Sequence, residues 1–276
     1  MDRMSGAAES MDKMPEGSLP LKLPTLDQAQ RLPVDLTALK SLGIFGFDSI
    51  DPRSRSFNLI RARLTSLHRE RGWRLFGIVS ATSQVGKSYM AANVAAALSR
   101  NPRYDATLVD LDLRRGSASS QCGIDADVSM RDYLDGVDTV RTPPAYAFDG
   151  QRLLILPTRA GVVRSAEMLA GVRAQAMFRA MRADAQNSLY IVDLPPVFAN
   201  DDASTVMQRL DAYILVAEEG KTTKREIREA TGLLGQERLA GVILNKYRGG
   251  LMSEGYGVED YYNRGYGYGA DEQATE

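Results

Sequence analysis

One segment combines small residues, an amine and a hydroxyl in an order that suits phosphate binding. It runs from Ser80 to Ser88 with the sequence SATSQVGKS and joins an apolar run to a helical pattern. A loop at such a junction can point backbone N–H groups at phosphate oxygens, and the positive end of the following helix favours an anion. In this arrangement Gly86 lets the chain approach the phosphates, Lys87 reaches the terminal phosphates, and the Ser88 hydroxyl ligates a magnesium ion.

The segment matches a phosphate-binding P-loop incompletely. Ala81 stands where the usual pattern has its first glycine, and Gln84 occupies a position that is often glycine as well. An ordinary strand-to-helix turn that contains Gly-Lys-Ser therefore stays open as an alternative when the loop is considered alone. The choice depends on whether other parts of the chain supply groups for the same site.

Three carboxylates follow apolar runs and could supply those groups. Asp110 and Asp112 are two residues apart, so both project from one face while the chain is extended, and they can share one task near a metal. Asp193 ends another apolar run, and Pro195 and Pro196 then force the chain out of sheet pairing. A single acid after a strand is more often a helix cap or a turn former. The coincidence of these features with the loop favours one shared site.

The last part of the chain offers phenolic hydroxyl groups. After Arg248 the composition changes to Gly, Tyr, Asp and Glu, and the glycines deny the segment a regular element. Five of the chain's 12 tyrosines lie within thirteen positions of this tail: Tyr256, Tyr261, Tyr262, Tyr266 and Tyr268. The interleaved glycines would let any of these tyrosines enter a site, whereas an association-prone, low-complexity terminus is the alternative interpretation.

Alternating strands and helices are predicted to position these groups. Apolar runs of strand type cover residues 75–80, 106–109, 153–156, 189–192, 212–217 and 241–244. Near-continuous apolar strands between amphipathic helices indicate a mostly parallel central sheet that helices cover on both faces. An amphipathic helix with Phe57, Leu64 and Leu67 on one face precedes the first of these strands. Because ligands of such α/β folds bind at the carboxyl ends of the strands, the loop and the acids are expected to meet there.

The chain divides into three parts on composition and pattern. Residues 1–45 are expected to be a flexible leader, because most of that sequence lacks sustained periodicity. Apolar residues between Leu39 and Phe47 could dock on the following domain or on a partner. Residues 46–248 are expected to form one P-loop domain, and residues 249–276 a flexible tail rich in Gly and Tyr.

Composition narrows the classes of function. The 34 Lys and Arg residues against 35 Asp and Glu residues give a net charge of -1, so no whole-chain field would attract nucleic acid or anionic lipid. The single cysteine, Cys122, cannot form an internal disulfide, and no His/Cys cluster has metal-ligand spacing, so a reducing compartment is expected. No run approaches the ~18 apolar residues that a bilayer crossing needs, and a cytoplasmic protein without a membrane span is expected.

These motifs resemble those of the bacterial tyrosine kinases, the autokinases of capsule and exopolysaccharide systems, whose P-loop fold is unrelated to that of eukaryotic kinases. The similarity covers roughly residues 51–246, and the tail adds to it. The loop resembles the family's A-type motif, residues 108–114 resemble its Asp-x-Asp-x-Arg motif, and residues 190–196 resemble its Asp-x-Pro-Pro motif. The resemblance implies a P-loop NTPase three-layer sandwich. It also implies an ATP-dependent protein-tyrosine autokinase that phosphorylates its own tail and regulates exopolysaccharide or capsule synthesis and export.

The resemblance further implies roles for individual residues. Catalytic roles would belong to Lys87, Asp110, Asp112 and Asp193, with Asp110 accepting or orienting the proton of the attacking tyrosine hydroxyl. A magnesium ion would be held by Ser88 together with Asp112 and Asp193. ATP would contact the loop and the end of the last strand through Ser83, Gln84, Val85, Gly86, Lys87, Ser88, Tyr89 and Asn245. The phosphate acceptors would be the five clustered tyrosines of the tail.

Departures from the family pattern keep two other functions open. A partitioning or positioning ATPase of the ParA and MinD kind shares this fold, but Thr82 occupies the place of the signature lysine that those proteins carry early in the loop. Alternatively, Gln84 and Val85 could have reduced catalysis. The chain would then be a nucleotide-gated binding partner of a polysaccharide export complex.

Partners and a location also follow from the resemblance. A homo-oligomer is expected, although the helix before the core carries Arg55, Asn58 and Arg61 in place of the family's Glu-x-x-Arg-x-x-Arg motif for ring assembly. The sequence lacks the two membrane spans of a fused chain-length regulator. A separate inner-membrane polysaccharide chain-length regulator would therefore recruit and activate the protein at the inner face of the cell membrane.

Overall fold

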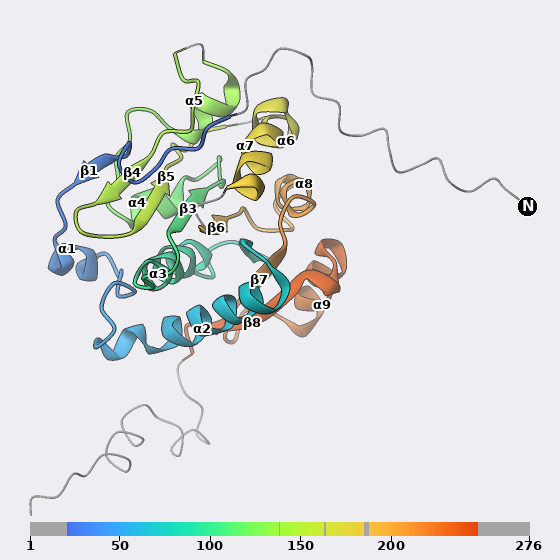
Figure 1. The fold of residues 1–276 in the computed structure, drawn as a ribbon. Helices are drawn as coiled ribbons and strands as arrows, with labels where there is room; N and C mark the ends of the chain where they lie inside the picture. Colours follow the sequence, from blue (N-terminus) through green and yellow to red (C-terminus); the bar gives the residue numbers. More distant parts are fainter. Residues whose placement is uncertain (1–20, 138, 163, 185–187, 248–276) are drawn as a thin grey trace, which may run out of the picture.

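An eight-stranded sheet organises the described part of the chain. The computed structural model describes residues 21–137, 139–162, 164–184 and 188–247. Within these residues the sheet has the order β1-β4-β5-β3-β6-β2-β7-β8, and only β4 and β5 are antiparallel neighbours (Figure 1). The strands are β1 (Gln30–Leu32), β2 (Leu75–Ser80), β3 (Ala106–Asp110), β4 (Tyr146–Phe148), β5 (Leu153–Leu156), β6 (Leu189–Asp193), β7 (Ala212–Glu218) and β8 (Leu239–Asn245).

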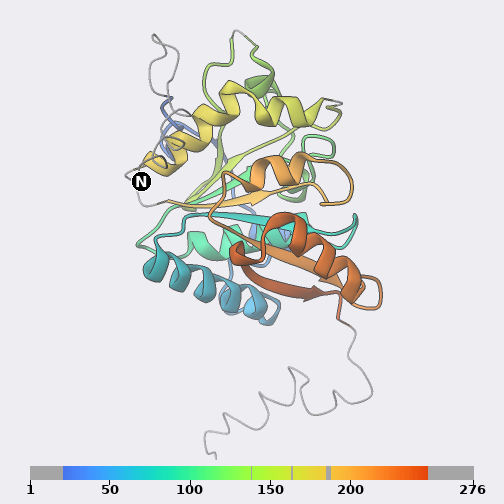
Figure 2. The ribbon, with the colours of Figure 1, turned by 90° about the vertical axis from the view of Figure 1, so that its right-hand side faces the viewer.

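Helices cover both faces of this sheet. On one face lie α1 (Leu36–Ser41), α2 (Arg55–Arg71), α3 (Lys87–Ser99) and α4 (Ser117–Gln121). On the other lie α5 (Met130–Asp135), α6 (Ser165–Ala170), α7 (Val172–Ala183), α8 (Asp202–Met207) and α9 (Lys224–Leu234). The three layers can be followed in Figure 1 and, after a quarter turn, in Figure 2. The predicted three-layer α/β sandwich with a mostly parallel sheet is therefore confirmed.

The six strands predicted from apolar runs are all present. They are β2, β3, β5, β6, β7 and β8. Every residue of β2, β3, β5 and β6 is buried. Because helices lie on both sides, each side chain of these strands meets apolar neighbours whichever face it points to, which explains why the runs do not alternate with polar residues.

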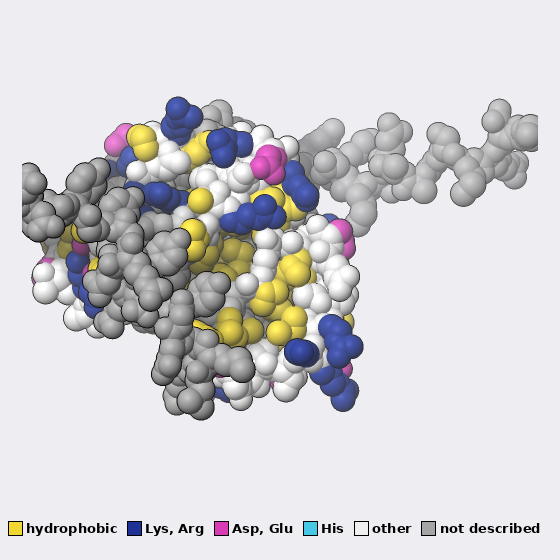
Figure 3. All heavy atoms as spheres, turned by 90° about the horizontal axis from the view of Figure 1, so that it is seen from below, with side chains coloured by type: hydrophobic (Ala, Val, Ile, Leu, Met, Phe, Trp, Pro, Cys, Tyr) yellow, Lys and Arg dark blue, Asp and Glu magenta, His cyan; other side chains and the backbone are white. Residues whose placement is uncertain are grey.

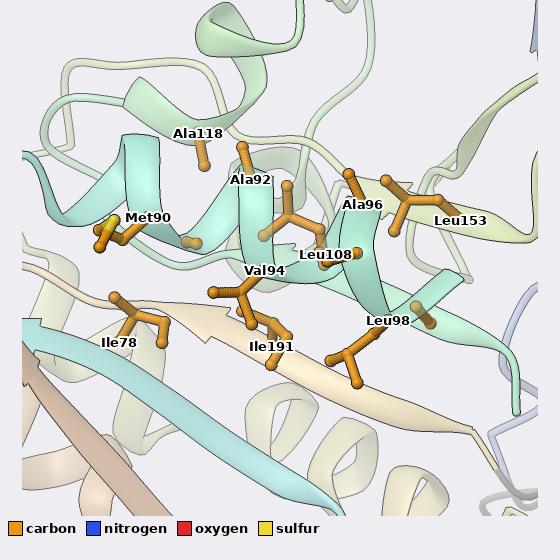
Figure 4. Close-up of a cluster of buried hydrophobic side chains, with 14 of the residues drawn as sticks. Ile78, Met90, Ala92, Val94, Ala96, Leu98, Leu108, Ala118, Leu153 and Ile191 are labelled. Carbon is orange, nitrogen blue, oxygen red and sulfur yellow. The ribbon is translucent and has the colours of Figure 1, made fainter. Parts of the chain in front are cut away.

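The helix that follows the P-loop segment lies close against the middle of the sheet. Its inner positions are small, and Figure 4 shows Ala92, Val94 and Ala96 among buried side chains that include Leu108 of β3 and Ile191 of β6. Small side chains allow the helix axis to approach the strands closely. This packing fixes where α3 begins, and therefore where Lys87 and its neighbours lie relative to the strand ends.

The expected flexible leader is wrong for residues 30–45. These residues add β1 to the sheet edge, in parallel with β4, and then form α1. Leu39 and Ile44 are buried in the same core as α3, so the apolar residues of this stretch dock on the domain. The short strand has no periodicity of its own. Its pairing partner lies more than a hundred residues later in the chain, which is why the sequence pattern does not reveal it.

Asn93 of α3 holds the end of this N-terminal segment in place. Its side-chain oxygen accepts hydrogen bonds from the backbone N–H groups of Phe45 (2.7 Å) and Gly46 (3.0 Å), and its amide donates to the Gly43 carbonyl oxygen (2.9 Å). A Cβ atom at Gly46 would collide with the Asn93 backbone oxygen, so only glycine fits there. The segment is thus bound to the domain by a fully buried amide.

The lower face of the molecule in Figure 1 carries α2, α9 and the outer edge of β8. Exposed hydrophobic residues on these elements and just after β8 are Leu59, Leu233, Val242, Leu244 and Tyr247. Seen from below, hydrophobic side chains gather between groups of Lys and Arg side chains (Figure 3). The chain leaves the described residues on this edge, because Tyr247 follows β8 almost directly.

Several predictions concern residues outside the described part. Residues 1–20 of the expected leader and residues 249–276 of the expected tail lie there, and with them Tyr256, Tyr261, Tyr262, Tyr266 and Tyr268. Among the residues that the structure describes, no helix has the length and apolar character needed to cross a membrane.

Candidate functional site

The segment between β2 and α3 forms a loop with two residues in the left-handed region of backbone conformation. Gly86 has a φ of 91° and directly precedes α3, and a Cβ atom there would collide with the Asn245 side chain. Gln84 has a φ of 65°. A side chain in this conformation costs roughly 1–2 kcal/mol, which explains why such loop positions favour glycine. The loop therefore keeps the tight path of a phosphate-binding loop despite its unusual sequence.

The N-terminus of α3 points into this loop. The backbone N–H groups of the first helical turn, which includes Lys87, Ser88 and Tyr89, have no partner within the helix and can bind an anion. The Tyr89 ring packs edge-on against Phe57 of α2, with a centroid distance of 5.8 Å. Tyr89 can therefore take part in the loop through its backbone, while its ring belongs to the packing of α2.

The three strand ends that carry the predicted residues are neighbours in the sheet. The order β3-β6-β2 places them side by side, and Asp110 is the register partner of Asp193. Because these strands are parallel, their carboxyl ends lie at one edge, where the loop also begins. The predicted convergence of the loop with the three acids is what the topology produces.

Lys87 connects the loop to the acids. Its ammonium nitrogen lies 2.8 Å from Asp112 Oδ2 and 3.8 Å from Asp193 Oδ1, and all three side chains are buried. Burial by itself would lower the pKa of Lys87. The carboxylates of Asp193 and Asp112 outweigh that effect together, so the pKa of Lys87 is raised and the amine stays charged.

Asp193 has one oxygen engaged and one free of hydrogen bonds. The Ser88 hydroxyl donates to Oδ2 at 2.6 Å, whereas Oδ1 is buried with no hydrogen-bond partner. Burial raises the pKa of Asp193 to about 6, although Lys87 and the Ser88 hydroxyl oppose the shift. A buried acceptor without a donor is costly, so this oxygen is suited to an added cation or donor.

Asp110 is fully buried, and both of its carboxylate oxygens accept hydrogen bonds. Its Oδ2 accepts hydrogen bonds from the Ser119 backbone N–H (3.0 Å) and hydroxyl (2.9 Å), and its Oδ1 accepts one from the Asp112 N–H (3.2 Å). Burial and, to a smaller extent, the charge of Asp193 together raise its pKa to about 7, although the hydrogen bonds from Ser119 oppose the shift. In this arrangement Asp110 holds the turn that carries Asp112.

Two residues of this network have no role in the sequence-based prediction. Ser119 of α4 binds Asp110, and its hydroxyl oxygen accepts a hydrogen bond from the Thr158 backbone N–H at 3.0 Å. The Thr158 hydroxyl donates to the Asp110 carbonyl oxygen at 2.6 Å. The only sequence signal for Ser119 and Thr158 is that each is a polar residue that follows an apolar strand. That pattern is too common to identify them as part of a site.

The end of β8 holds the loop from the other side. Asn245 donates its side-chain N–H to the Val85 carbonyl oxygen at 2.8 Å, and the Lys246 ammonium group donates to the Gln84 carbonyl oxygen at 2.8 Å. Glu218 of β7 pairs with Lys246 at 3.2 Å. The predicted residue Asn245 therefore lies directly beside the loop, and Lys246 joins it there.

The protein side chains alone do not complete a metal site. Among the described residues no group of three or more His, Cys, Asp or Glu side chains is arranged to hold a metal ion. Cys122 is buried away from solvent, and burial raises the pKa of its thiol to about 12. A cation at this edge would need further oxygen ligands from a bound phosphate compound or from water.

Comparison with known proteins places the chain in a family of nucleotide-binding domains. The family model described as "CobQ/CobB/MinD/ParA nucleotide binding domain" matches residues 76–263, more than half of the chain. Putative tyrosine-protein kinase EpsB of Ralstonia nicotianae is 28% identical over 223 residues, which cover 78% of this chain and 29% of EpsB. Tyrosine-protein kinase YwqD of Bacillus subtilis is 26% identical over 213 residues, covering 76% of this chain and 88% of YwqD.

A solved structure agrees with these relatives. The kinase domain of Escherichia coli tyrosine kinase ETK aligns with a TM-score of 0.58 and 28% identity, covering 71% of this chain and 79% of that domain. The resemblance to bacterial tyrosine kinases is therefore confirmed. The chain spans less than a third of the length of EpsB and most of the length of YwqD.

Proposed function

Because this chain belongs to the CobQ/CobB/MinD/ParA nucleotide-binding domain family, we propose that it is an ATP-dependent protein-tyrosine autokinase. The observation that carries the proposal is the convergence of the loop with Asp112 and Asp193 around the Lys87 ammonium group. Relatives named as tyrosine-protein kinases support this choice over other nucleotide-dependent activities. The substrate, the roles of residues and the partners given below are parts of the same proposal.

ATP is the nucleotide that we assign to the loop. The backbone N–H groups of residues 83–89 would hold its phosphates, with the Lys87 ammonium group on the terminal ones. Asn245 lies next to Val85 and Gly86, so it is close to any nucleotide bound in the loop. The hydroxyl of Ser83 lies in the same loop and is the remaining side chain that we assign to phosphate contact.

The residues present suit a magnesium ion. Mg²⁺ prefers oxygen ligands and is usually held by one or two carboxylates together with substrate phosphates and waters. The Ser88 hydroxyl, the Asp112 carboxylate and the hydrogen-bond-free Oδ1 of Asp193 are such donors. We assign the ion to these three residues. When bound, it would neutralise negative charge that develops on the transferred phosphoryl group.

The chain's own groups would align the reactants and move one proton. A bond forms between the tyrosine oxygen and the terminal phosphorus, and the bond from that phosphorus to ADP breaks. A phenol with a pKa of ~10 keeps its proton at neutral pH, so a carboxylate must accept it. Asp110 is the proposed acceptor, because burial raises its pKa toward neutrality and so makes the carboxylate a stronger base than an exposed one.

The proposed acceptors of phosphate are the tail tyrosines Tyr256, Tyr261, Tyr262, Tyr266 and Tyr268. They follow the end of β8, and this strand end itself contacts the loop through Asn245 and Lys246. The tail is thereby tethered at the edge of the sheet where the phosphates would lie. Glycines between the tyrosines would let each of them adopt the backbone path that the site requires.

Partners and location are proposed from the relatives. We propose a homo-oligomer that works with an inner-membrane polysaccharide chain-length regulator at the inner face of the cell membrane. The pathway controlled would be exopolysaccharide or capsule synthesis and export. The support is the resemblance of the motifs to the autokinases of capsule and exopolysaccharide systems, together with relatives that are named as tyrosine-protein kinases.

The test is a map of phosphotyrosine after incubation of the full chain with ATP and Mg²⁺. Phosphate is expected on the tail of the wild type and absent from Lys87→Ala. Lys224→Ala, which removes an exposed lysine at the start of α9, is the control and should keep the signal. Nucleotide binding is measured in parallel, so that a chain that binds ATP but transfers no phosphate is distinguished from a chain that binds no ATP.

Two other outcomes would replace the proposal. Hydrolysis of ATP by water without phosphotyrosine would identify an ATPase switch of the ParA and MinD kind, whose nucleotide-binding domain the family model also describes. Tight ATP binding with negligible turnover, unchanged in Asp110→Asn, would identify a nucleotide-gated binding partner.

A further inference from the structure

Two loops beside the site are joined to each other and to its acids. The first follows β3, and its turn is closed by hydrogen bonds from the Arg115 and Gly116 N–H groups to the Asp112 carbonyl oxygen (3.0 and 2.7 Å). The second follows β5, and its Gly161 N–H donates to the Arg114 carbonyl oxygen at 3.3 Å. A Cβ atom at Gly116 would collide with the Thr158 carbonyl oxygen, so the loops touch closely. They form one rim next to Asp112.

This rim is rich in arginine on its outer side. Its exposed arginines are Arg114, Arg115, Arg159 and Arg164, a set that we call the arginine rim. Two of these arginines have acid partners, because Arg114 lies 3.6 Å from buried Asp202 and Arg159 lies 3.8 Å from Asp132. Exposed Glu167 and Asp201 lie nearby in the sequence, but among the described residues neither Arg115 nor Arg164 forms an ion pair. Arg115 and Arg164 are therefore the guanidinium groups of the rim that an added carboxylate can reach most directly.

Arg114 is fixed within the rim by buried groups. Its Nε donates to the Ser165 hydroxyl at 3.1 Å and lies 3.6 Å from Asp202 Oδ2, and Ser165 itself donates to that oxygen at 2.6 Å. The rim therefore has a rigid anchor and three more exposed arginines around it. Guanidinium groups are suited to carboxylates, which they can bind in a bidentate manner.

The chain contains a segment of the opposite charge. Residues 249–276 hold six acids, namely Glu254, Glu259, Asp260, Asp271, Glu272 and Glu276, and only one basic residue, Arg264. Two of the acids directly precede Tyr261 and Tyr262. The negative charge of this tail segment complements the arginine rim. The rim in turn lies next to Asp112, one of the site residues that would act on the tail tyrosines.

The length of the tail is sufficient to reach the rim within one chain. The tail starts at the end of β8, and β5, which leads into the rim, lies five strand spacings away, about 24 Å. Tyr256 lies nine positions after Tyr247, and an extended chain of nine residues spans up to about 30 Å. Each later tyrosine is separated from β8 by a longer stretch of chain. The tail is therefore long enough to contact the rim of its own chain as well as that of a second copy.

We propose that the arginine rim is the docking site for the acidic, tyrosine-bearing segment 249–276 and selects tyrosines with acidic neighbours as substrates. The inference rests on the proposed kinase function and extends it to substrate recognition. Electrostatic docking beside the reacting groups raises the local concentration of the tail without adding contacts to the phosphates. The source of the tail, the same chain or a second copy, is distinguished by experiment.

The experiment compares two double variants. The rim variant is Arg115→Glu/Arg164→Glu, and the matched control is Arg63→Glu/Arg228→Glu, which reverses the charge of two exposed arginines on α2 and α9. The enzyme is the full chain with its five tail tyrosines changed to phenylalanine and its six tail acids changed to the matching amides, so that its own tail does not compete for the rim. A peptide with the sequence of residues 249–276 is the substrate. In the rim variant, KM for the peptide should rise on the order of tenfold at low salt while kcat changes little. The control variant should match the wild type, and added salt should narrow the difference.

A binding measurement separates failure of this inference from failure of the kinase function. The labelled peptide is titrated by fluorescence anisotropy without ATP, and its affinity should fall on the order of tenfold in the rim variant. If the wild type forms no phosphotyrosine but the peptide binds in a rim-dependent manner, the kinase proposal fails and the docking site stands. Equal peptide affinity and equal KM in the rim and control variants would overturn the docking site.

Mixed chains identify the source of the tail. A Lys87→Ala chain with an intact tail is combined with an active chain whose tail tyrosines are phenylalanine. If the tail of the Lys87→Ala chain is phosphorylated, and the rim substitutions in the active chain reduce this signal, the rim binds the tail of a second copy. If the rim substitutions reduce tail phosphorylation of the otherwise wild-type chain, and no phosphate is transferred in the mixture, the rim binds the chain's own tail. If the rim substitutions change tail phosphorylation neither in the wild-type chain nor in the mixture of chains, the inference is overturned.

Discussion

At the scale of single residues, burial decides how the acids of the site behave. Asp110 and Asp193 lie at the ends of fully buried strands, and desolvation raises their pKa values to about 7 and about 6. The charged amine of Lys87 lowers the pKa of Asp193 but has no hydrogen bond to Asp110. Without a bound cation, the site therefore holds more carboxylates than its single amine can neutralise.

The raised pKa of Asp110 makes the stability of the nucleotide-free chain depend on pH. The folded chain binds a proton on Asp110 more tightly than the unfolded chain, so stability falls as pH rises from about 4 to about 7. Asp110→Asn removes this contribution, which is on the order of 2–4 kcal/mol for such a shift. Urea unfolding from pH 5 to 8 should show a flatter stability profile for Asp110→Asn than for the wild type. Exposed Asp149 provides the control, since Asp149→Asn should keep the wild-type slope; equal slopes in all three chains would contradict the prediction.

At the scale of elements, the N-terminal segment depends on one buried amide. Asn93 satisfies the backbone N–H groups of Phe45 and Gly46 and the carbonyl oxygens of Gly43 and Tyr89. An alanine at position 93 would leave the Phe45 and Gly46 N–H groups and the Gly43 carbonyl oxygen without this partner in a place that water reaches poorly, whereas the Tyr89 carbonyl oxygen keeps its hydrogen bond within α3.

We expect Asn93→Ala to destabilise the chain by about 2–3 kcal/mol, because each unsatisfied buried group costs roughly 1–3 kcal/mol. Hydrogen exchange should increase first in residues 30–46, where β1 and α1 attach. Asn101→Ala removes a partly exposed side-chain bond to the Arg103 N–H and should cost well under half as much. An Asn93→Ala chain with wild-type stability and exchange would show that the segment is held by other contacts.

The elements also show what the sequence could and could not reveal. Strands such as β3 and β6 were predictable, because a buried parallel strand leaves a continuous apolar run. β1 and β4 were not, because three-residue strands at a sheet edge gain their pairing from distant parts of the chain. Lys87 and the acids were predictable from motif spacing. The positions of Ser119 and Thr158 depend on how loops pack on Asp110, and no local pattern encodes that contact.

At the scale of the whole molecule, one edge of the sheet gathers groups from the entire length of the described chain. The loop after β2 is bound by the end of β8, and the acids come from β3 and β6. A ligand that contacts all of these strands must stabilise the domain as a unit, because unfolding of any one strand would destroy the site. Ligand binding should therefore be visible as a change in global stability.

We expect ATP with Mg²⁺ to raise the Tm of the full chain. At a nucleotide concentration one hundred times the Kd the stabilisation is about 2.7 kcal/mol, which corresponds to roughly 5–10 °C for a domain of this size. Removing Mg²⁺ with a chelator should abolish most of the rise, because Asp112 and Asp193 would then face the phosphates without a metal ion, and the single charge of Lys87 cannot offset both acids and the phosphates. Asp193→Asn should lose the dependence on Mg²⁺, whereas Asp149→Asn should keep it. A rise of equal size with and without Mg²⁺ in the wild type would contradict the assignment of the cation to this edge.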